Sequence, residues 1–589
     1  MCLLCAANPS SDRLSSYDLH DGASDGSIGN ASSGPITAAG SGAGGSHAPY
    51  TWDQIAGYLT DGYWGFNGGV WRAFDLGPGR VITYDTSRLS PLAAAIAEYA
   101  LDVWAAATGI NFVDAGTTAS LFTEGADIGG NIATATGIST NTIVTGSIGA
   151  VGDADYYRVT LVAGQTYMIG MTQTTGSNVD AVLRLLDSAG AVLQTSDDPS
   201  TAAAGEYITF TATTTGTYYI SAADYGTRTG GYELSIQGAS DLTFNDMDQT
   251  GAYAWSDISG NSILQSFINI NDSWDMLNLN GYMLQTYIHE LGHALGLGHA
   301  GPYNGDAVWG SDNLYDNDSW STTIMSYFDQ LDNTFDPSDL AYLATIMPAD
   351  IIAIQNLYGA GSVGYQPGNT VWGPGGNVGG YFQQLLDIWG GVMPANPLIY
   401  DGNNFAFTVY DTAGIDTLNF SVFSQNQVIN LNPLVRSNVG GVIGNVVIAR
   451  GVVIENATGG SGNDAITGNA AANVLIGNGG NDTLQGGVGA DVLNGGSGVD
   501  YAVYWAATSS VSVDLQAGTG SVGEAAGMCS RGWRTWPAVP LATRCRATAG
   551  RTGWTVWRAT TFWPAAQAMT RWSGRMATTR CRAASGRTC

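Results

Sequence analysis

Residues 281–299 read GYMLQTYIHELGHALGLGH, and the interpretation of the whole chain starts from this stretch. It contains the pattern H-E-x-x-H-x-x-G-x-x-H. His289 and His293 are four residues apart, so on a helix their imidazoles lie on one face and can bind one zinc ion. Glu290 would lie beside the metal, placed to take a proton from water. Gly296 can adopt the left-handed conformation that ends a helix, which would bring His299 back as a third ligand.

A second motif follows at residues 321–327, STTIMSY. Three of the five histidines of the chain fall in the first motif, so histidines that merely fill a core or face solvent explain the pattern poorly. With both motifs, the sequence resembles the metzincin zinc peptidases, whose zinc motif is followed by a methionine turn. The resemblance implies a multidomain α+β protein, with a twisted mixed sheet plus helices in the catalytic domain.

The composition limits the classes of function. The chain has 589 residues, which predicts several domains, and carries 49 acidic residues against 20 basic ones, all of them arginine. This acidity argues against a nucleic-acid partner and suits binding of hard cations. The sequence has no apolar run long enough for a membrane span, and its apolar start, MCLLCAA, is too short for a signal peptide.

The first part of the chain predicts a flexible leader and then half of a catalytic domain. Residues 1–47 are small and polar, as in a linker or pro-segment. In residues 48–125, TWDQIAGYLTDGYW predicts a short amphipathic helix, and RVITYDT and INFVDA predict strands. Between those strands, SPLAAAIAEYALDVWAAATG predicts a long helix that Gly109 can end.

Residues 126–237 contain many short alternating runs separated by turns, which predicts a β-sandwich inserted into the catalytic domain. YYRVTL, TYMIGM, TYYISA and YELSIQ predict strands, and AVLRLLDSAGAVLQTS predicts a hairpin. The segment resembles the bacterial pre-peptidase C-terminal domain in GDADYYRVTLVAGQTY and TGTYYIS.

Residues 238–360 are expected to complete the catalytic domain. DLTFNDMD, AYAWSD and SFINI predict strands before the zinc helix, and PADIIAIQNLYG predicts the closing helix. An edge strand in metzincins pairs with the extended substrate. The candidate residues for that role are Ala252, Tyr253, Ala254 and Trp255.

Residues 361–525 are predicted to form a calcium-binding parallel β-roll. A nine-residue period begins at Gly459, Gly468, Gly477, Gly486 and Gly495. Ile466, Leu475, Leu484 and Leu493 recur in step, which a flexible linker does not explain. The second unit has Asn473 at the aspartate position, so its site should be weaker. The candidate calcium-binding residues are Gly459, Gly460, Gly462 and Asp464; Gly477, Gly479, Gly480 and Asp482; Gly486, Gly487, Gly489 and Asp491; and Gly495, Gly496, Gly498 and Asp500.

The last segment, residues 526–589, differs from the rest of the chain. From residue 528 onwards it holds 11 of the 20 arginines and four of the six cysteines but no acidic residue. One interpretation is a basic arm. Another is a slipped reading frame, because neighbouring-frame translations such as GDTLSGDGGANRLTGLAGDDVL restore β-roll sequence. We favour a frameshifted, disordered tail, which resequencing the coding DNA would test.

Together, the zinc motif, the methionine turn and the β-roll resemble the serralysin family of secreted bacterial zinc endopeptidases. Further likeness lies in IQNLYG and in FSQNQVINL…GNVVIARGVVIENATGGSGND. The resemblance implies zinc binding by His289, His293, His299 and Tyr327, with Glu290 as the base and Met325 beneath the metal. Ala300 departs from the family, which usually has proline there.

The expected function is therefore hydrolysis of extracellular proteins or peptides by a secreted enzyme with one catalytic Zn²⁺ and several structural Ca²⁺. We expect a monomer that leaves the cell through a one-step (type I) exporter, although the export signal of the native C-terminus is expected to be lost in this chain. The alternative is an inactive, calcium-stabilised surface or adhesion protein. Cleavage specificity, natural substrate and the role of the insert cannot be deduced from the sequence.

Overall fold

The computed structural model describes residues 47–504 except 116–119, 126–127, 175, 198–204, 239, 247–250, 272–279, 306 and 362–365. Of the predicted leader, residues 1–47, all but the last residue lie outside the described residues. Beyond residue 504, six short strands are described: β30 (Val511–Asp514), β31 (Thr519–Val522), β32 (Cys529–Arg531), β33 (Thr543–Ala547), β34 (Val556–Arg558) and β35 (Arg580–Ala583). Nothing in these strands tests the reading-frame hypothesis.

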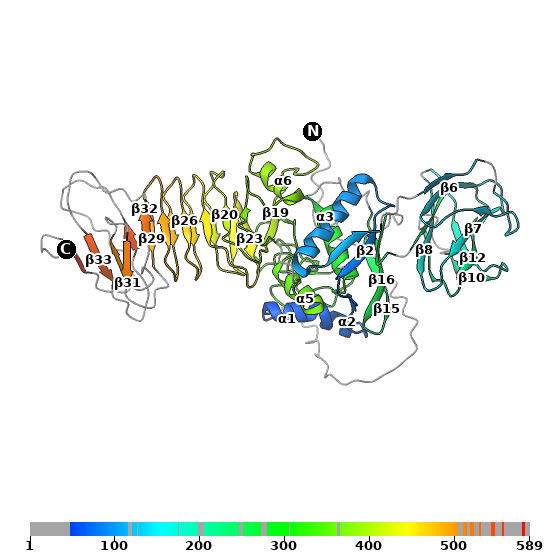
Figure 1. Ribbon diagram of the computed structural model, residues 1–589, viewed down its shortest axis with the longest axis horizontal. Coiled ribbons are helices and arrows are strands. Elements are labelled where there is room, and N and C mark those ends of the chain that lie inside the picture. The colour runs from blue at the N-terminus through cyan, green and yellow to red at the C-terminus, as the bar shows by residue number, and fades with distance from the viewer. Residues whose placement is uncertain are drawn as a thin grey trace.

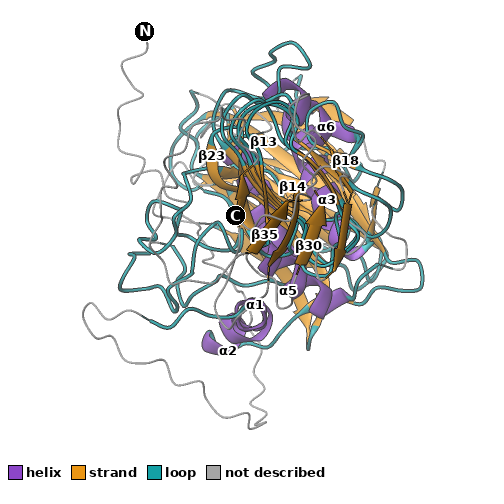
Figure 2. Cartoon of the chain, turned by 90° about the vertical axis from the view of Figure 1, so that its left-hand side faces the viewer, coloured by secondary structure: helices purple, strands orange, loops and turns teal. Residues whose placement is uncertain are grey.

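The molecule is elongated, with three parts arranged along its long axis (Figure 1). A sheet with helices lies in the middle, two facing sheets lie at one end, and a stack of short strands lies at the other. Figure 2 looks along this axis from the side of the stack. None of the helices in the described part of the chain is long and apolar enough to span a membrane.

The middle part is built on a mixed six-stranded sheet. Five strands are parallel in the order β1-β16-β14-β2-β3, and β15 pairs antiparallel with the free side of β16. The strands predicted in this part of the chain are all present. The bounds are β1 (Ala73–Phe74), β2 (Val81–Asp85), β3 (Asn111–Asp114), β14 (Leu242–Asn245), β15 (Tyr253–Ser259) and β16 (Ser262–Asn269).

Helices pack on this sheet where the sequence predicts them. The long helix α3 (Pro91–Thr108) begins at the Ser90 cap and ends at Gly109, which has a φ of 65°. The motif helix is α4 (Tyr282–Ala294), and α5 (Pro348–Tyr358) closes the domain. The expected N-terminal helix is present but interrupted, because a π-helical turn, η1 (Tyr58–Gly62), separates α1 (Trp52–Gly57) from α2 (Tyr63–Phe66). One helix, α6 (Gly380–Trp389), was not predicted.

Two five-stranded sheets form the end that Figure 1 shows on the right. Their inward side chains share one buried apolar cluster, to which Tyr157, Val159 and Leu161 of the predicted strand YYRVTL belong. One sheet has the order β10-β9-β12-β7-β5 and the other β11-β8-β13-β6-β4. The bounds are β4 (Ser120–Thr123), β5 (Thr136–Gly137), β6 (Thr142–Ile148), β7 (Ala154–Leu161), β8 (Thr166–Gln173), β9 (Ala181–Leu186), β10 (Val192–Ser196), β11 (Glu206–Thr211), β12 (Gly216–Asp224) and β13 (Gly230–Gln237).

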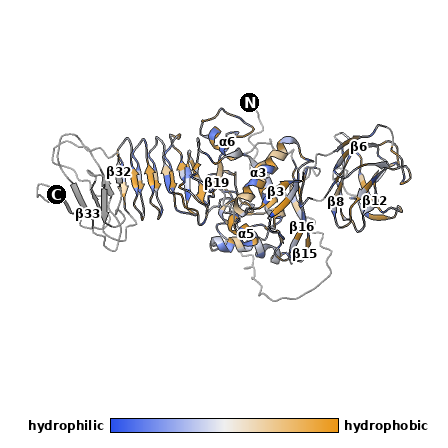
Figure 3. Cartoon of the chain, in the orientation of Figure 1, coloured by the Kyte–Doolittle hydropathy of each residue, from blue (hydrophilic) through white to orange (hydrophobic). Residues whose placement is uncertain are grey.

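The opposite end is a stack of short strands in two sheets, and hydrophobic residues recur along these strands (Figure 3). One sheet contains β17 (Tyr342–Leu343), β19 (Phe405–Val409), β23 (Val442–Ile448), β22 (Arg436–Val439), β21 (Val428–Asn430), β25 (Ala465–Thr467), β27 (Thr483–Gln485), β29 (Tyr501–Val503) and β34. The other contains β18 (Val371–Trp372), β20 (Thr417–Asn419), β24 (Asn456–Thr458), β26 (Val474–Ile476), β28 (Val492–Asn494), β32, β31, β30, β33 and β35.

The stack shares its core with the middle part, whereas the two facing sheets have a core of their own. One cluster of buried side chains runs from Ile55 in α1 to Leu493 in β28. The four predicted core residues of the repeat, Ile466, Leu475, Leu484 and Leu493, are at most 1% exposed. Parallel pairing of every second strand, as between β25 and β27, places successive repeats on alternate sheets.

Candidate functional site

Helix α4 and the turn after it carry the three histidines of the motif. His289 and His293 lie one turn apart on α4, which ends at Ala294. The chain then reverses through Gly296, whose φ of 105° confirms the predicted left-handed glycine. A Cβ atom at this position would lie 2.1 Å from the Arg72 carbonyl oxygen, so a larger residue would not fit.

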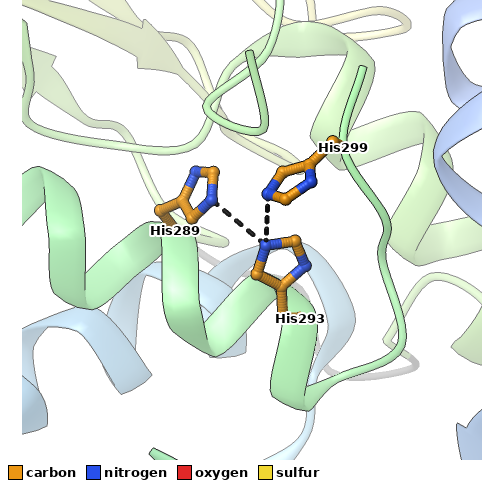
Figure 4. Close-up of side chains that lie close together, drawn as sticks. All are labelled: His289, His293 and His299. Carbon is orange, nitrogen blue, oxygen red and sulfur yellow. Dashed lines mark hydrogen bonds between the residues drawn. The ribbon is translucent and has the colours of Figure 1, made fainter. Parts of the chain in front are cut away.

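The three imidazoles converge through their Nε2 atoms (Figure 4). The Nε2 atom of His293 lies 3.1 Å from that of His289 and 2.9 Å from that of His299. Each Nδ1 atom lies 2.8–2.9 Å from a backbone carbonyl oxygen. The carbonyl of Ile324 faces His289, that of Leu297 faces His293, and that of Tyr303 faces His299. A carbonyl only accepts hydrogen bonds, so each Nδ1 carries the proton and each neutral ring directs its Nε2 lone pair at the same point.

The electrostatics of the cluster favour this neutral form. Burial lowers the pKa of His289 to about 3, and electrostatic repulsion from the neighbouring His293 contributes a smaller part of this shift. Burial likewise holds the pKa of His299 well below its ordinary value. Three unprotonated nitrogens within 4.8 Å of one another repel unless a cation lies between them, and imidazole nitrogens are ligands that zinc prefers. The residues therefore fit a zinc ion.

The Met325 side chain packs against α4 at Gly292, which lies between His289 and His293 in the sequence. A Cβ atom on Gly292 would lie 2.6 Å from the Met325 sulfur and 3.2 Å from the Trp104 ring. The Trp104 indole also donates a hydrogen bond to the Ile288 carbonyl oxygen. The sequence analysis placed Met325 under the metal but did not identify Gly292 or Trp104, whose importance becomes visible only in the packing.

Two buried aspartates support the segments whose carbonyls orient the histidines, and the sequence analysis missed both. Asp350 accepts hydrogen bonds from the Thr323 hydroxyl and the Ile324 amide, next to the carbonyl that holds His289. Asp318 accepts hydrogen bonds from the hydroxyls of Tyr303 and Ser326. Burial raises the pKa of each carboxyl to about 7.

The two residues expected to act on the substrate lie at the same place. Glu290, next to His289 on α4, is fully buried. Tyr327 is half-buried, with its ring centroid 4.5 Å from that of His299 and 6.2 Å from that of His289. Its hydroxyl lies 3.4 Å from the Gly305 amide, which donates to it. The structure thus places the Tyr327 ring against the histidine cluster and a buried Glu290 next to His289 on α4.

The residues expected to bind the substrate backbone lie on an edge strand. Tyr253, Ala254 and Trp255 belong to β15, and Ala252 precedes it. β15 pairs with β16 through residues 253–259, and in the described part of the chain no other strand pairs with its outer side. The Trp255 ring stacks on Phe267 of β16, with centroids 4.3 Å apart. A free, antiparallel strand edge can accept an extended peptide.

The aspartates of the nine-residue repeat are far from the histidines in sequence and form two ladders along the stack. In each ladder, the backbone amide at one aspartate position donates to the carboxylate of the aspartate 18 residues later. The Asp464 amide donates to the Asp482 carboxylate, and the Asp482 amide donates to the Asp500 carboxylate. The equivalent bond on the other side runs from Asn473 to Asp491. All four aspartates are buried, which raises their pKa, that of Asp482 to about 7.

The glycines predicted for calcium binding form the tight turns between these rungs. At Gly480, which has a φ of 107°, a Cβ atom would lie 2.0 Å from the Gly462 carbonyl oxygen one coil below. The remaining predicted glycines lie in the same turns, before β25, β27, β28 and β29. Buried carboxylates next to backbone carbonyls fit a hard divalent cation, which offsets the cost of burying their charge.

Asn473 places a side-chain amide where the other units of the repeat have a carboxylate. Its amide nitrogen donates to the Glu455 carbonyl oxygen at 2.8 Å and to the Asn469 side-chain oxygen at 3.0 Å. The ladder also begins earlier than the repeat, because the amide of Gln427 donates to Asp464, and that of Thr370 donates to Asp416. The stretch GIDTLNF around Asp416 resembles a repeat unit and could have revealed this first rung.

Comparison with known proteins places two segments in described families. Residues 400–518 match the family Peptidase M10 serralysin C terminal, and residues 153–223 match the bacterial pre-peptidase C-terminal domain. The crystal structure of the pre-peptidase C-terminal domain of collagenase from Bacillus anthracis covers 18% of this chain and 94% of its own, at 23% identity and a TM-score of 0.15, too low to support an argument.

Relatives that match about a third of this chain agree with the serralysin assignment. The chain is 40% identical over 237 residues to serralysin of Photorhabdus laumondii subsp. laumondii, covering 38% of this chain and 45% of the relative. It is 42% identical to metallopeptidase AprA of Pseudomonas marginalis (32% and 38%) and to serralysin C of Dickeya chrysanthemi (37% and 43%). The chain thus spans less than half the length of these relatives. The matches confirm the similarity to the serralysin family and to the pre-peptidase C-terminal domain.

Proposed function

We propose that this serralysin-like chain is a secreted zinc endopeptidase that hydrolyses peptide bonds in extracellular proteins. The observation that carries the proposal is the convergence of three neutral imidazoles, each fixed by a carbonyl at Nδ1, beside a buried glutamate. The similarity to proteins named serralysin and metallopeptidase supports it. His289, His293 and His299 would hold one zinc ion, with Tyr327 as a further ligand in the resting enzyme.

Zinc in such a site supplies Lewis acidity towards the scissile carbonyl and the attacking water. Glu290 takes a proton from that water and passes it to the leaving amine, a role for which its place beside His289 is suited. Tyr327 donates a hydrogen bond from its hydroxyl to the oxyanion that develops on the carbonyl. Burial of Glu290 keeps bulk water from competing for its proton.

The substrate would bind as an extra strand along β15. In the described part of the chain no strand other than β16 pairs with β15, and such a strand edge offers backbone donors and acceptors to an extended peptide whatever the peptide sequence. The strand that pairs with β15 is also in contact with the zinc helix, since the Ser266 hydroxyl of β16 donates to the Ala294 carbonyl oxygen at the end of α4. This arrangement would direct the bound peptide past the histidines.

The remaining parts of the proposal concern the outer ends of the molecule. We assign the segment from β4 to β13 as an inserted β-sandwich, which starts at Ser120 and not at residue 126 as predicted, because β4 pairs with β6 and the two sheets enclose a core of their own between β3 and β14. We assign residues 361–525 as a β-roll that binds several calcium ions through the aspartate ladders. Calcium abundant outside the cell would complete its folding after export through a one-step exporter, and the chain would act as a monomer.

Removal and return of zinc tests the proposed function. The full chain, folded with calcium, should hydrolyse an unstructured protein such as casein. Stripping the zinc with a chelator that leaves calcium bound should abolish hydrolysis, and one equivalent of zinc should restore it. Hydrolysis that survives complete removal of zinc would contradict the proposal.

A further inference from the structure

The turn after α4 has little rigidity of its own, although it presents a ligand. Residues 295–299 contain glycine at positions 296 and 298, and glycine has the greatest conformational freedom of any residue. The turn also sets the orientation of a second ligand, since the Leu297 carbonyl oxygen accepts from His293 Nδ1. Movement of the turn would therefore displace both His299 and His293 from the point where the Nε2 atoms meet.

The N-terminal helical segment, residues 52–66, covers this turn from outside. The Leu59 carbonyl oxygen accepts a hydrogen bond from the Gly298 amide at 2.7 Å. The Trp64 indole nitrogen donates to the Gly296 carbonyl oxygen at 2.8 Å. The Tyr63 ring meets the His299 ring edge-on, with centroids 5.1 Å apart. This one short segment thus contacts two glycines and the third histidine of the motif.

The fit between the segment and the turn leaves no free space. A Cβ atom on Gly298 would lie 2.2–2.5 Å from atoms of the Tyr63 side chain. On the other side of the turn, the Arg72 carbonyl oxygen closes against Gly296, and the Arg72 guanidinium lies 3.7 Å above the Trp64 ring. Tyr63 and Trp64 are themselves at most 8% exposed. The turn can move only if these buried rings move with it.

The segment is anchored independently at its start. The backbone amide and carbonyl of Tyr50 pair with the side-chain amide of Asn317 at 2.7 and 2.9 Å. The Tyr50 ring stacks on Tyr315, with centroids 4.6 Å apart and planes 18° apart. Thr51 then caps α1. These contacts fix the segment to the loop that precedes the methionine turn, so it can act as a support for the histidine turn.

We propose that Tyr63 and Trp64 are positioning residues for the metal centre: from the N-terminal segment they hold the turn 295–299 so that His299 and His293 meet His289. This inference rests on the proposed zinc site. Both side chains are buried against the turn, so the proposed role is to position the ligands and not to contact substrate. Their contribution should appear in the affinity for the metal and in the geometry of the ligands, because groups that orient ligands are typically worth about 10–100-fold in metal affinity.

The test is metal binding by the full chain, in calcium, after the zinc has been removed. Trp64→Phe deletes the indole donor and keeps an aromatic ring. Tyr63→Leu deletes the ring that meets His299, whereas Tyr63→Phe keeps it. Trp372→Phe is the matched control, because the Trp372 indole donates to Asp411 in the stack, far from the histidines in sequence. Zinc affinity is measured by competition with a chelator, and ligand geometry by the visible absorption of the Co²⁺-substituted protein.

We expect Trp64→Phe and Tyr63→Leu to weaken zinc binding about tenfold or more and to shift the Co²⁺ absorption bands. Tyr63→Phe and Trp372→Phe should match the parent in both measurements. Zinc affinity and Co²⁺ bands unchanged in Trp64→Phe and Tyr63→Leu would overturn the inference, and so would an equal loss in Trp372→Phe. A parent chain that binds no zinc would instead overturn the proposed function itself, which separates the two failures.

Discussion

The hydroxyl of Tyr327 accepts from the Gly305 amide, while its ring lies against His299 and Tyr303. Tyr327→Phe keeps these ring contacts and removes the donor proposed for the oxyanion. Turnover of a peptide substrate should fall about 100-fold, with little change in thermal unfolding. Tyr381→Phe, which removes a hydroxyl bonded to the Ile399 carbonyl oxygen, should leave turnover unchanged. Equal turnover in Tyr327→Phe and the parent would refute the role.

Asp318 links the stability of this region to pH. Burial raises the pKa of its carboxyl to about 7 in the folded protein, from an ordinary value of 3.8. Between these values the folded chain retains a proton that the unfolded chain releases, so the free energy of unfolding falls as the pH rises from about 4 to about 7. One such group contributes a slope of up to about 1.4 kcal/mol per pH unit.

Asp318→Asn should therefore flatten the dependence of the unfolding free energy on pH in that range. Urea unfolding at a series of pH values, with calcium and zinc held constant, measures the slope for variant and parent. Identical slopes would show that Asp318 does not carry the proton.

At the residue scale, the sequence predicted the ligands better than their supports. Histidines at positions 289, 293 and 299 follow from local geometry, because helix periodicity and one glycine turn suffice to bring them together. The supporting residues are near the site only because segments distant in sequence pack together, as for Asp318, Asp350 and Trp64. No local pattern identifies such residues, since each would suit an ordinary loop or helix equally well.

At the scale of the element, the ladder of the β-roll depends on which side chain fills each rung. Asn473 directs an amide at two oxygens, those of Glu455 and Asn469. An aspartate there would direct a carboxylate at the same oxygens and repel them unless a cation intervenes. Asn473→Asp should destabilise the calcium-free protein by about 1–3 kcal/mol, the cost of replacing satisfied buried hydrogen bonds.

Millimolar calcium should remove most of that loss by adding a rung to the ladder. Thermal unfolding with a calcium chelator and with calcium measures both effects. Asn494→Asp adds the same charge at a half-buried end of β28 and serves as the control. A variant that unfolds like the parent in both conditions would contradict the ladder.

The elements themselves were predictable where a period or a cap was local. Helix α3 begins at Ser90 and ends at Gly109 as expected, and the repeat located the strands from β25 onwards. The earlier rungs β20 and β21 were missed because their coils lack the glycine-rich turn. The π-helical turn η1 was missed because its residues also suit an α-helix.

At the scale of the whole molecule, the facing sheets are joined to the middle part by specific contacts. Arg88, which follows β2 in the middle part and whose side chain is 5% exposed, forms an ion pair with Glu233 of β13 in the facing sheets. Glu233→Gln should lower the free energy of unfolding by about 1 kcal/mol. The loss is modest because about a third of the Glu233 side chain is exposed to solvent. Calorimetry of the full chain measures the change.

The ion pair between Asp53 and Arg450 provides the contrast. It joins α1 to the stack, but both side chains are exposed, so Asp53→Asn should leave unfolding unchanged. An equal effect of the two substitutions would show that burial does not set the strength of these links. The relative placement of the three parts could not be predicted from the sequence, because it depends on a few such contacts rather than on a repeated pattern.

The central claim is that the three histidines and Glu290 form a working peptidase centre. The most direct measurement is casein hydrolysis by the full chain with zinc and calcium, beside Glu290→Ala, with the zinc content of both determined. We predict that the parent cleaves casein and that Glu290→Ala does not, although both hold one zinc ion. Hydrolysis by Glu290→Ala at the parent rate, or zinc-loaded parent protein that cleaves nothing, would contradict the claim.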